Sequence, residues 1–172
     1  MKTATYPLLH RTPSPLGDIL LAATTEGLCG LWFDGQKHMP DMTDWQPGHN
    51  AVIERARQQM QQYFARQRDT FDLPLDLSAG TPFQQAVWQA LLAIPCGSHS
   101  SYGAIALRIR NPKAVRAVGA AVGRNPISVI VPCHRVLGAS GDLTGYAGGL
   151  ERKTALLERE GVLAAPQQAT LV

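Results

Sequence analysis

Residues 101–123 read SYGAIALRIRNPKAVRAVGAAVG, and this stretch decides the fold of the second half of the chain. Ser101 can cap a first helix. The residues that this helix would bury are Tyr102, Ile105, Ala106 and Ile109. After Arg110, Asn111 can cap another helix with Pro112 at its first position. Two short helices joined by a tight turn predict a helix-turn-helix.

The second of these helices has one apolar face and one nearly bare face. The apolar face consists of Val115, Val118, Gly119 and Val122. On the other face, Lys113 and Arg116 are charged, and the remaining positions are Ala or Gly. Small side chains let a helix approach another surface closely, which favours insertion into a nucleic-acid groove. A helix packed tightly on a neighbour within the protein would need the same small residues, so that alternative stays open.

The first 77 residues predict a small α+β domain with an antiparallel sheet. The expected elements are strands over 16–23 and 27–34, a loop over 36–50, a helix over 51–66 and an edge strand over 71–77. The sequence TTEG at 24–27 lies between the two strands and predicts a hairpin turn.

Residues 78–80 predict a linker to a second, mostly helical domain over 81–165, followed by a tail over 166–172. Thr81 and Gln84 can form the capping box of its first helix. The other expected elements are the helix-turn-helix, a buried strand over 127–131, a glycine-rich loop over 138–149 and a helix over 150–160.

Charge is divided unevenly along the chain, although the formal net charge is only +3. Residues 77–141 contain no Asp or Glu and carry six Lys and Arg, whereas both flanks are mildly acidic. The six are Arg108, Arg110, Lys113, Arg116, Arg124 and Arg135. Soluble surfaces ordinarily mix both signs, so this block predicts a surface for a polyanion such as the nucleic-acid backbone. A basic patch that arose by chance is the alternative.

Composition bounds the compartment and the chemistry. The apolar stretches are too short to span a membrane, and residues 1–11 lack the features of a signal peptide. Three cysteines without paired spacing predict free thiols in a reducing compartment. No CxxC or HxxxH spacing is present, so we expect a cytoplasmic protein without a metal site.

The sequence PCHRV at 132–136 places a thiol directly after the expected strand, beside an imidazole and a guanidinium. These surroundings favour the thiolate of Cys133, which is the nucleophilic form. Adjacent residues on an extended chain point opposite ways, so His134 can act as its base only across a sharp turn or through a water. A buried structural thiol is the alternative. Cys29 and Cys96 have no neighbouring base, and we assign them no chemistry.

Glu160 lies in the last turn of the final expected helix, where its carboxylate opposes the helix dipole. A cationic or hydrogen-bonding partner would compensate it, and His134 is a candidate. A solvent-exposed glutamate near a helix end is the alternative.

Six motifs occur in series across the second half of the chain. They are YG at 102–103, NPKAVRAVG at 111–119, NP at 125–126, VPCHRV at 131–136, GYAGG at 145–149 and LLEREG at 156–161. The series resembles the methylated-DNA–protein-cysteine methyltransferases, also called O6-alkylguanine-DNA alkyltransferases, in order and spacing from Thr81 to Gly161. Residues 1–77 resemble that family's N-terminal domain more loosely. The resemblance implies a ribonuclease-H-like N-terminal domain and a winged-helix-like C-terminal domain.

The resemblance also implies a reaction, namely a single irreversible transfer of an alkyl group to Cys133 without a cofactor. The substrates would be O6-alkylguanine and O4-alkylthymine in double-stranded DNA, reached by base flipping. His134 would activate the thiol through a water, and Glu160 would orient His134. Tyr146 would protonate or hydrogen-bond the leaving guanine, and Asn125 would brace the neighbouring turn.

The DNA contacts implied by the resemblance come mainly from the helix-turn-helix. Arg116 would enter the duplex in place of the flipped nucleotide, and Tyr102 would crowd the adjacent phosphate. The other expected DNA-binding residues are Lys113, Ala114, Ala117, Arg124 and Arg135. The pocket for the flipped base would include Val136, Ala147 and Gly148. We expect a monomer that can cluster cooperatively on DNA and has no membrane partner.

Two positions depart from the family pattern. Arg110 lies in the helix-turn-helix turn, where relatives commonly carry Gly, which predicts a turn of different shape or an added phosphate contact. Ala147 replaces a Ser found in some relatives, but the implied contact there is through the backbone.

Two rival functions fit parts of the sequence. One is a helix-turn-helix regulator or a lesion-sensing relative, but the lesion sensors replace the cysteine that this chain retains. The other is a thiol hydrolase that uses Cys133, His134 and Glu160, which leaves the acid-free block unexplained and would show repeated turnover.

Overall fold

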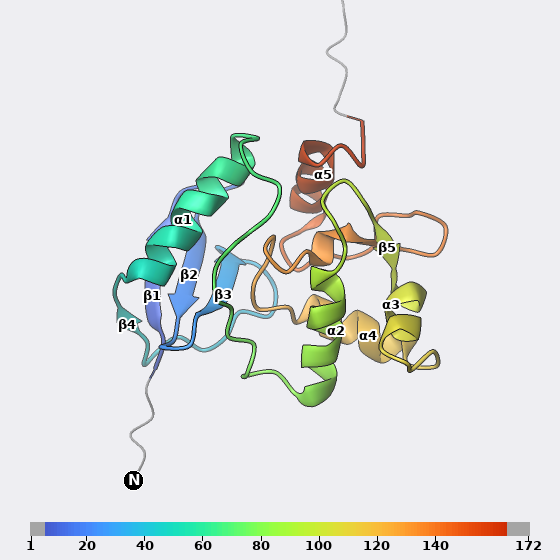
Figure 1. Ribbon diagram of the computed structural model, residues 1–172, viewed down its shortest axis with the longest axis horizontal. Helices are drawn as coiled ribbons and strands as arrows, with labels where there is room; N and C mark the ends of the chain where they lie inside the picture. Colours follow the sequence, from blue (N-terminus) through green and yellow to red (C-terminus); the bar gives the residue numbers. More distant parts are fainter. Residues whose placement is uncertain (1–5, 165–172) are drawn as a thin grey trace, which may run out of the picture.

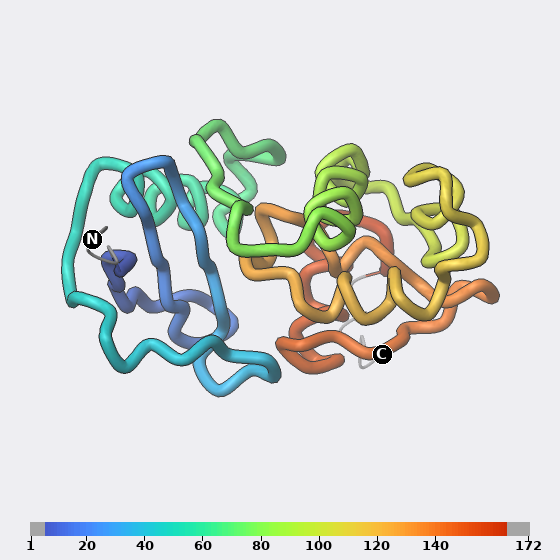
Figure 2. The backbone as a smooth tube through the Cα atoms, turned by 90° about the horizontal axis from the view of Figure 1, so that it is seen from below, coloured from blue at the N-terminus to red at the C-terminus, as the bar shows by residue number. Residues whose placement is uncertain are grey.

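The computed structural model describes residues 6–164 and has two halves that lie side by side, as Figures 1 and 2 show. The first half contains a sheet, and the second is mostly helical (Figure 1). One hydrophobic core includes buried residues from both halves, among them Phe33, Ile53, Leu91, Val131 and Leu156. The predicted α+β class is therefore confirmed.

The sheet of the first half has four strands in the order β3-β2-β1-β4. Their bounds are β1 Leu8–Thr12, β2 Ile19–Ala23, β3 Leu28–Phe33 and β4 Gln46–Pro47. The first three pair antiparallel, and the two-residue β4 pairs parallel to β1. The predicted hairpin is confirmed as β2 and β3, whereas β1 and β4 were not predicted.

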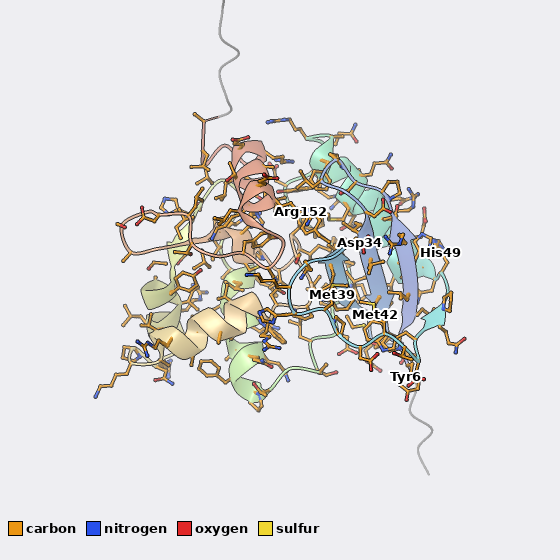
Figure 3. All side chains as sticks on the ribbon, turned by 180° about the vertical axis from the view of Figure 1, so that it is seen from behind. Tyr6, Asp34, Met39, Met42, His49 and Arg152 are labelled. Atoms are coloured by element: carbon orange, nitrogen blue, oxygen red, sulfur yellow. The ribbon has the colours of Figure 1, made fainter. Side chains whose placement is uncertain are left out.

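Each face of this sheet is covered by a different element. Helix α1, Ala51–Phe64, packs on one face, and the side chain of Asn50 caps its start. Figure 3 shows Met39 and Met42, in the loop that connects β3 with α1, beside the opposite face. These residues and Trp45 pack on Leu20, Ala22 and Trp32. The connecting loop therefore has a small apolar cluster of its own.

The second half consists of helices around short strands. Their bounds are α2 Pro82–Leu92, β5 Ser100–Ser101, α3 Tyr102–Arg108, α4 Val115–Gly123, the 3-10 helix η1 Cys133–Arg135, β6 Val136–Leu137 and α5 Leu150–Arg159. The predicted capping box at Thr81 is present, because Thr81 and Gln84 exchange both hydrogen bonds. The indole nitrogen of Trp88 in α2 donates to the carbonyl of Ala121 in α4 at 2.9 Å, and this hydrogen bond connects the two helices.

The predicted start of the second helix is wrong by about one turn. Residues 111–114 form a turn closed by the Ala114 amide and the Asn111 carbonyl at 3.0 Å, and α4 begins only at Val115. Helix α4 buries Val118, Ala121 and Val122, while Val115 is 41% exposed. The predicted burial of Val115 is therefore also wrong.

Two predicted strands are replaced by irregular segments on the free edge of β3. Residues 127–131 form a compact turn with a single bridge from Ile127 to Leu31. Residues 71–77 contribute one bridge, from Leu75 to Leu28, because Pro74 has no amide hydrogen to extend a ladder. Both segments pair with the edge of β3. Because residues 127–131 belong to the second half, this edge connects the two halves.

Arg152 of α5 adds a further connection between the halves. Its guanidinium donates to the Leu16 carbonyl at 2.9 Å and lies 4.8 Å from the centre of the Phe33 ring. Figure 3 shows its position relative to Asp34, at the end of β3. Across residues 6–164, every helix is too short or too polar to cross a lipid bilayer.

Candidate active site and nucleic-acid interface

The turn before Cys133 is held by the buried side chain of Asn125. Its amide nitrogen donates to the Val131 carbonyl at 2.7 Å, and its amide oxygen accepts from the Ile127 backbone at 3.0 Å. Within this turn Val129 has a φ of 70°, a conformation that a β-branched residue rarely adopts. The bracing role implied for Asn125 thus has a physical basis, since its two bonds close the strained turn that leads to the thiol.

The thiol of Cys133 is buried, with 6% of the residue exposed, at the start of η1. Burial raises its pKa to about 11, although the Asn125 amide and the Lys153 ammonium act in the opposite direction. The expectation that the surroundings favour thiolate at rest is therefore wrong. The reason is that Arg135, the cation next along the chain, forms its bonds elsewhere. A reaction at this sulfur needs a base that takes the proton.

His134 is completely buried and hydrogen-bonds to Glu160, with 2.7 Å between Nε2 and Oε2. Burial lowers the pKa of His134, and Arg135 and Lys153 lower it further, while Glu160 raises it. The ring is therefore neutral near pH 7, with its proton on Nε2, which faces the carboxylate. Within residues 6–164, Nδ1 is buried and has no hydrogen-bond partner. A free lone pair on Nδ1 is what a general base requires.

Glu160 is the C-cap of α5, and its side chain is fully buried. Arg135 donates to Oε1 at 2.7 Å and to Oε2 at 3.0 Å, and Tyr63 donates to Oε2 at 2.6 Å. Burial raises the pKa of this carboxyl, but the hydrogen bonds from His134, Arg135 and Tyr63 outweigh it and hold the pKa at about 2. The expected compensation at the helix end exists and comes from several donors.

The prediction that Arg135 binds DNA is wrong. The residue is 6% exposed, and its guanidinium bonds Glu160 and the Ile94 carbonyl, the latter at 2.6 Å. A buried carboxylate without a cation would be strongly destabilising, so the nearest guanidinium is drawn inward. The acid-free block therefore contributes five cations to the surface instead of six.

Tyr146, Ala147 and Gly148 lie in the glycine-rich loop, and the first two line a cavity together with residues of α4. This cavity of about 270 Å³ is lined by Lys37, His38, Tyr102, Gly119, Val122, Gly123, Gly145, Tyr146 and Ala147. The Tyr146 hydroxyl is buried without a partner among residues 6–164, and burial raises its pKa. A side chain at Gly148 would come within 2.9 Å of the Tyr146 ring, so Gly148 permits this close approach. A larger cavity, about 490 Å³, lies between Thr12 and α1, in the other half of the chain from Cys133.

Several residues of this site were not predicted. Lys153 is fully buried, and its ammonium donates to the carbonyls of Val136 at 2.7 Å and Thr144 at 3.2 Å. Its spacing with Leu156 and Leu157 on one helix face is a signal that could have revealed its burial. Lys37 and His38 come from the loop before β4, and no motif in the sequence links them to the pocket.

The helix-turn-helix presents its cations to solvent. The exposed ones are Arg108, Arg110, Lys113, Arg116 and Arg124. Ala117 is exposed and Ala114 is half-buried, whereas Ala121, which was predicted on the bare face, is buried against α2. The alternative in which the bare face packs within the protein is therefore excluded for Arg116 and Ala117 but holds for Ala121. Tyr102, at the start of α3, bonds Thr144 of the glycine-rich loop at 2.7 Å, which joins the interface to the pocket.

Arg110 has a φ of 61°, so the turn keeps the left-handed conformation that glycine adopts freely. The predicted change in the shape of this turn is not needed. The side chain is exposed, which leaves it accessible to a phosphate.

Comparisons with known proteins agree with this arrangement. The family model described as the DNA binding domain of 6-O-methylguanine DNA methyltransferase matches residues 82–162, and the one described as its ribonuclease-like domain matches 2–77. Methylated-DNA–protein-cysteine methyltransferase of Mycobacterium tuberculosis H37Rv is 52% identical over 147 residues, covering 86% of this chain and 88% of that protein. The enzyme of the same name from Haemophilus influenzae is 45% identical over 151 residues, covering 87% and 84%.

Solved structures show the same similarity. The crystal structure of Mycobacterium tuberculosis OGT in complex with DNA has a TM-score of 0.83 and 49% identity, covering 90% of this chain and 92% of that one. The O6-methylguanine-DNA methyltransferase of Pyrococcus kodakaraensis, 24% identical with a TM-score of 0.60, shares the fold. This chain belongs to the methylated-DNA–protein-cysteine methyltransferase family.

Proposed function

We propose that this chain repairs DNA by transferring an alkyl group from O6 of guanine, and from O4 of thymine, to the sulfur of Cys133. The observation that carries the proposal is the combination at one place of a buried thiol, a neutral His134 with a free Nδ1, and the Glu160 carboxylate. The same half of the chain contains α4, whose exposed face is small and cationic.

The proton of the Cys133 thiol has to leave before the sulfur can attack. A water that bridges the sulfur and Nδ1 of His134 can carry this proton to the ring, and Glu160 stabilises the imidazolium through Nε2. The thiolate then attacks the alkyl carbon, a C–S bond forms, and the carbon–oxygen bond breaks with its electron pair going to the guanine. The Tyr146 hydroxyl supplies a proton to the departing base, and the proton that His134 took from the thiol passes through water to the Tyr146 phenolate, so that both side chains end neutral.

Reversal would require the new carbon–sulfur bond to break with the Cys133 thiolate as the leaving group. The thioether is too stable for this, so each protein molecule reacts once. Nothing in this scheme regenerates the thiol. The activity is therefore stoichiometric, and the protein acts as both catalyst and acceptor.

The base has to leave the helical stack, because a stacked guanine cannot present its O6 substituent in line with the sulfur. Extrusion costs roughly a few kcal/mol. Arg116 replaces the flipped nucleotide, and Tyr102 presses on the adjacent phosphate. Lys113 and Arg124 contact the backbone, while Ala114 and Ala117 allow close approach. Val136, Ala147 and Gly148 surround the extruded base.

The remaining parts of the proposal concern organisation. Residues 1–77 and 81–165 form the two domains, joined by a linker at 78–80. The protein binds DNA as a monomer that can cluster on the duplex, and it acts in the cytoplasm. The tail over 166–172 lies outside the described residues.

The decisive experiment is to mix the protein with a duplex containing O6-methylguanine and measure intact and peptide mass. We expect one added methyl group, on the peptide with Cys133, and none in Cys133→Ala. Cys29→Ala is the matched control, because burial also raises the pKa of that thiol to about 11 but no base accompanies it. Methyl on another residue would refute the proposal, and repeated turnover would favour the thiol hydrolase.

A further inference from the structure

The hydroxyl of Tyr63 reaches the active site from the other half of the chain. Tyr63 lies in α1, 97 residues before Glu160, and donates to Oε2 of Glu160 at 2.6 Å. We propose that Tyr63 is a positioning residue, which sets the orientation and proton affinity of His134 by sharing the carboxylate oxygen that holds it. This inference rests on the proposed role of His134 as the base.

Among the residues that the structure describes, three donors bind Oε2 of Glu160 and one binds Oε1. The three come from Tyr63 at 2.6 Å, His134 at 2.7 Å and Arg135 at 3.0 Å, and Oε1 binds Arg135 at 2.7 Å. Arg135 alone leaves the carboxylate free to tilt about the axis of its guanidinium. A donor from the opposite half of the molecule supplies a second fixed point, so Oε2 stays in line with Nε2 of His134.

Tyr63 itself is firmly fixed. The residue is fully buried, and its ring meets Phe64 and Phe71 at centroid distances of 5.2 and 5.6 Å. The Arg159 guanidinium lies 4.3 Å from the ring centre, and its Nε donates to the Tyr63 carbonyl at 2.6 Å. The hydroxyl therefore cannot turn away from Glu160 without disrupting this packing.

The hydrogen bond from the Tyr63 hydroxyl also lowers the electron density on Oε2 of Glu160. A carboxylate oxygen that accepts an additional hydrogen bond is a weaker acceptor toward its other donors, so it stabilises the imidazolium less. The charged groups that act on the His134 ring are Glu160, Arg135 and Lys153. Arg159 faces the Tyr63 ring. Removing only the hydroxyl leaves these groups in place, which isolates its effect on the His134 pKa.

Tyr63→Phe is the direct test, because the ring and its packing remain. The single-turnover rate of methyl transfer near pH 7.5 should fall roughly tenfold as the carboxylate loosens. The acid limb of the pH–rate profile should move to higher pH by roughly half a unit, because the imidazole now holds its proton more tightly. Nitrogen NMR of labelled histidine should show the same rise in the His134 pKa without any lesion DNA.

Phe71→Leu is the matched control, since it disturbs the same aromatic cluster but leaves the hydroxyl in place. It should keep both the wild-type pH profile and the wild-type His134 pKa. The inference is overturned if Tyr63→Phe matches the wild type in rate and His134 pKa, or if Phe71→Leu reproduces its effects. Failure of the wild type to methylate Cys133 would refute the proposed function, while the NMR measurement would still decide the role of Tyr63.

Discussion

Two regions formed from one basic stretch of sequence use charge in opposite ways. Around Cys133, Arg135 and Glu160 are buried and form an ion pair at 2.7 Å. On α4 and the turn before it, the cations Lys113 and Arg116 are exposed. The comparison shows that the position of a cation in the sequence does not reveal whether it is buried in an ion pair or exposed on the surface. Arg135 is buried because it pairs with the buried carboxylate of Glu160. Lys113 and Arg116 are exposed because the apolar face of α4 packs against the protein.

The largest effect is expected where the buried region loses its anion. Glu160→Gln should slow methyl transfer by about 10²–10³-fold, because the imidazolium and the tautomer of His134 lose their support. It should also lower the free energy of unfolding at pH 7 by about 3 kcal/mol, since Arg135 is left buried without its partner. Single-turnover kinetics and urea unfolding measure the two losses.

The pH dependence of unfolding provides the check on this variant. The pKa of Glu160 is about 2 in the folded chain against an ordinary value of 4.5, so the unfolded chain binds more protons between these values. Stability from this group is present above pH 4.5 and is lost as the pH falls toward 2. Glu160→Gln should lack that decline. An unchanged acid limb in the variant would show that Glu160 is not the anion of the buried region.

An intermediate effect is expected where the exposed region loses Arg116, the cation that we propose enters the duplex. Arg116→Ala should slow repair of duplex DNA roughly 100-fold, because extrusion of the base costs a few kcal/mol. Reaction with free O6-benzylguanine should stay near the wild-type rate, because no base has to be flipped.

Lys113→Ala is the companion variant for Arg116→Ala. Its loss should appear as weaker binding to all duplexes, with the salt slope reduced by about one, because it removes one phosphate contact. Equal losses on duplex and free base for Arg116→Ala would remove the distinction between the two regions, since both would then serve the chemical step.

The smallest effect concerns the turn within the exposed region. Arg110→Gly should raise the free energy of unfolding by up to about 1 kcal/mol, because glycine adopts a φ of 61° without the strain that arginine bears there. Arg110→Ala keeps the strain and loses the same charge, so it is the comparison to make in urea unfolding. If the glycine variant is no more stable than the alanine variant, strain at this turn is negligible.

Local patterns predicted the elements whose signals are themselves local. The capping box at Thr81, the hairpin around residues 24–27 and the exposed face of α4 all follow from neighbours within a few residues. The strand over 127–131 was wrongly predicted, because an apolar run does not distinguish a strand from a turn that is buried by its surroundings. There, the side chain of Asn125 replaces a ladder.

The sequence by itself determined the family, the candidate reactive residues Cys133, His134 and Glu160, and the cationic character of residues 77–141, because these depend on residue identity and short spacing. The tertiary structure alone decided that the thiol rests protonated, that Arg135 is buried, and that Tyr63 joins Glu160. Each of these depends on desolvation and on contacts across as many as 97 residues of chain, and neither quantity can be read from local spacing.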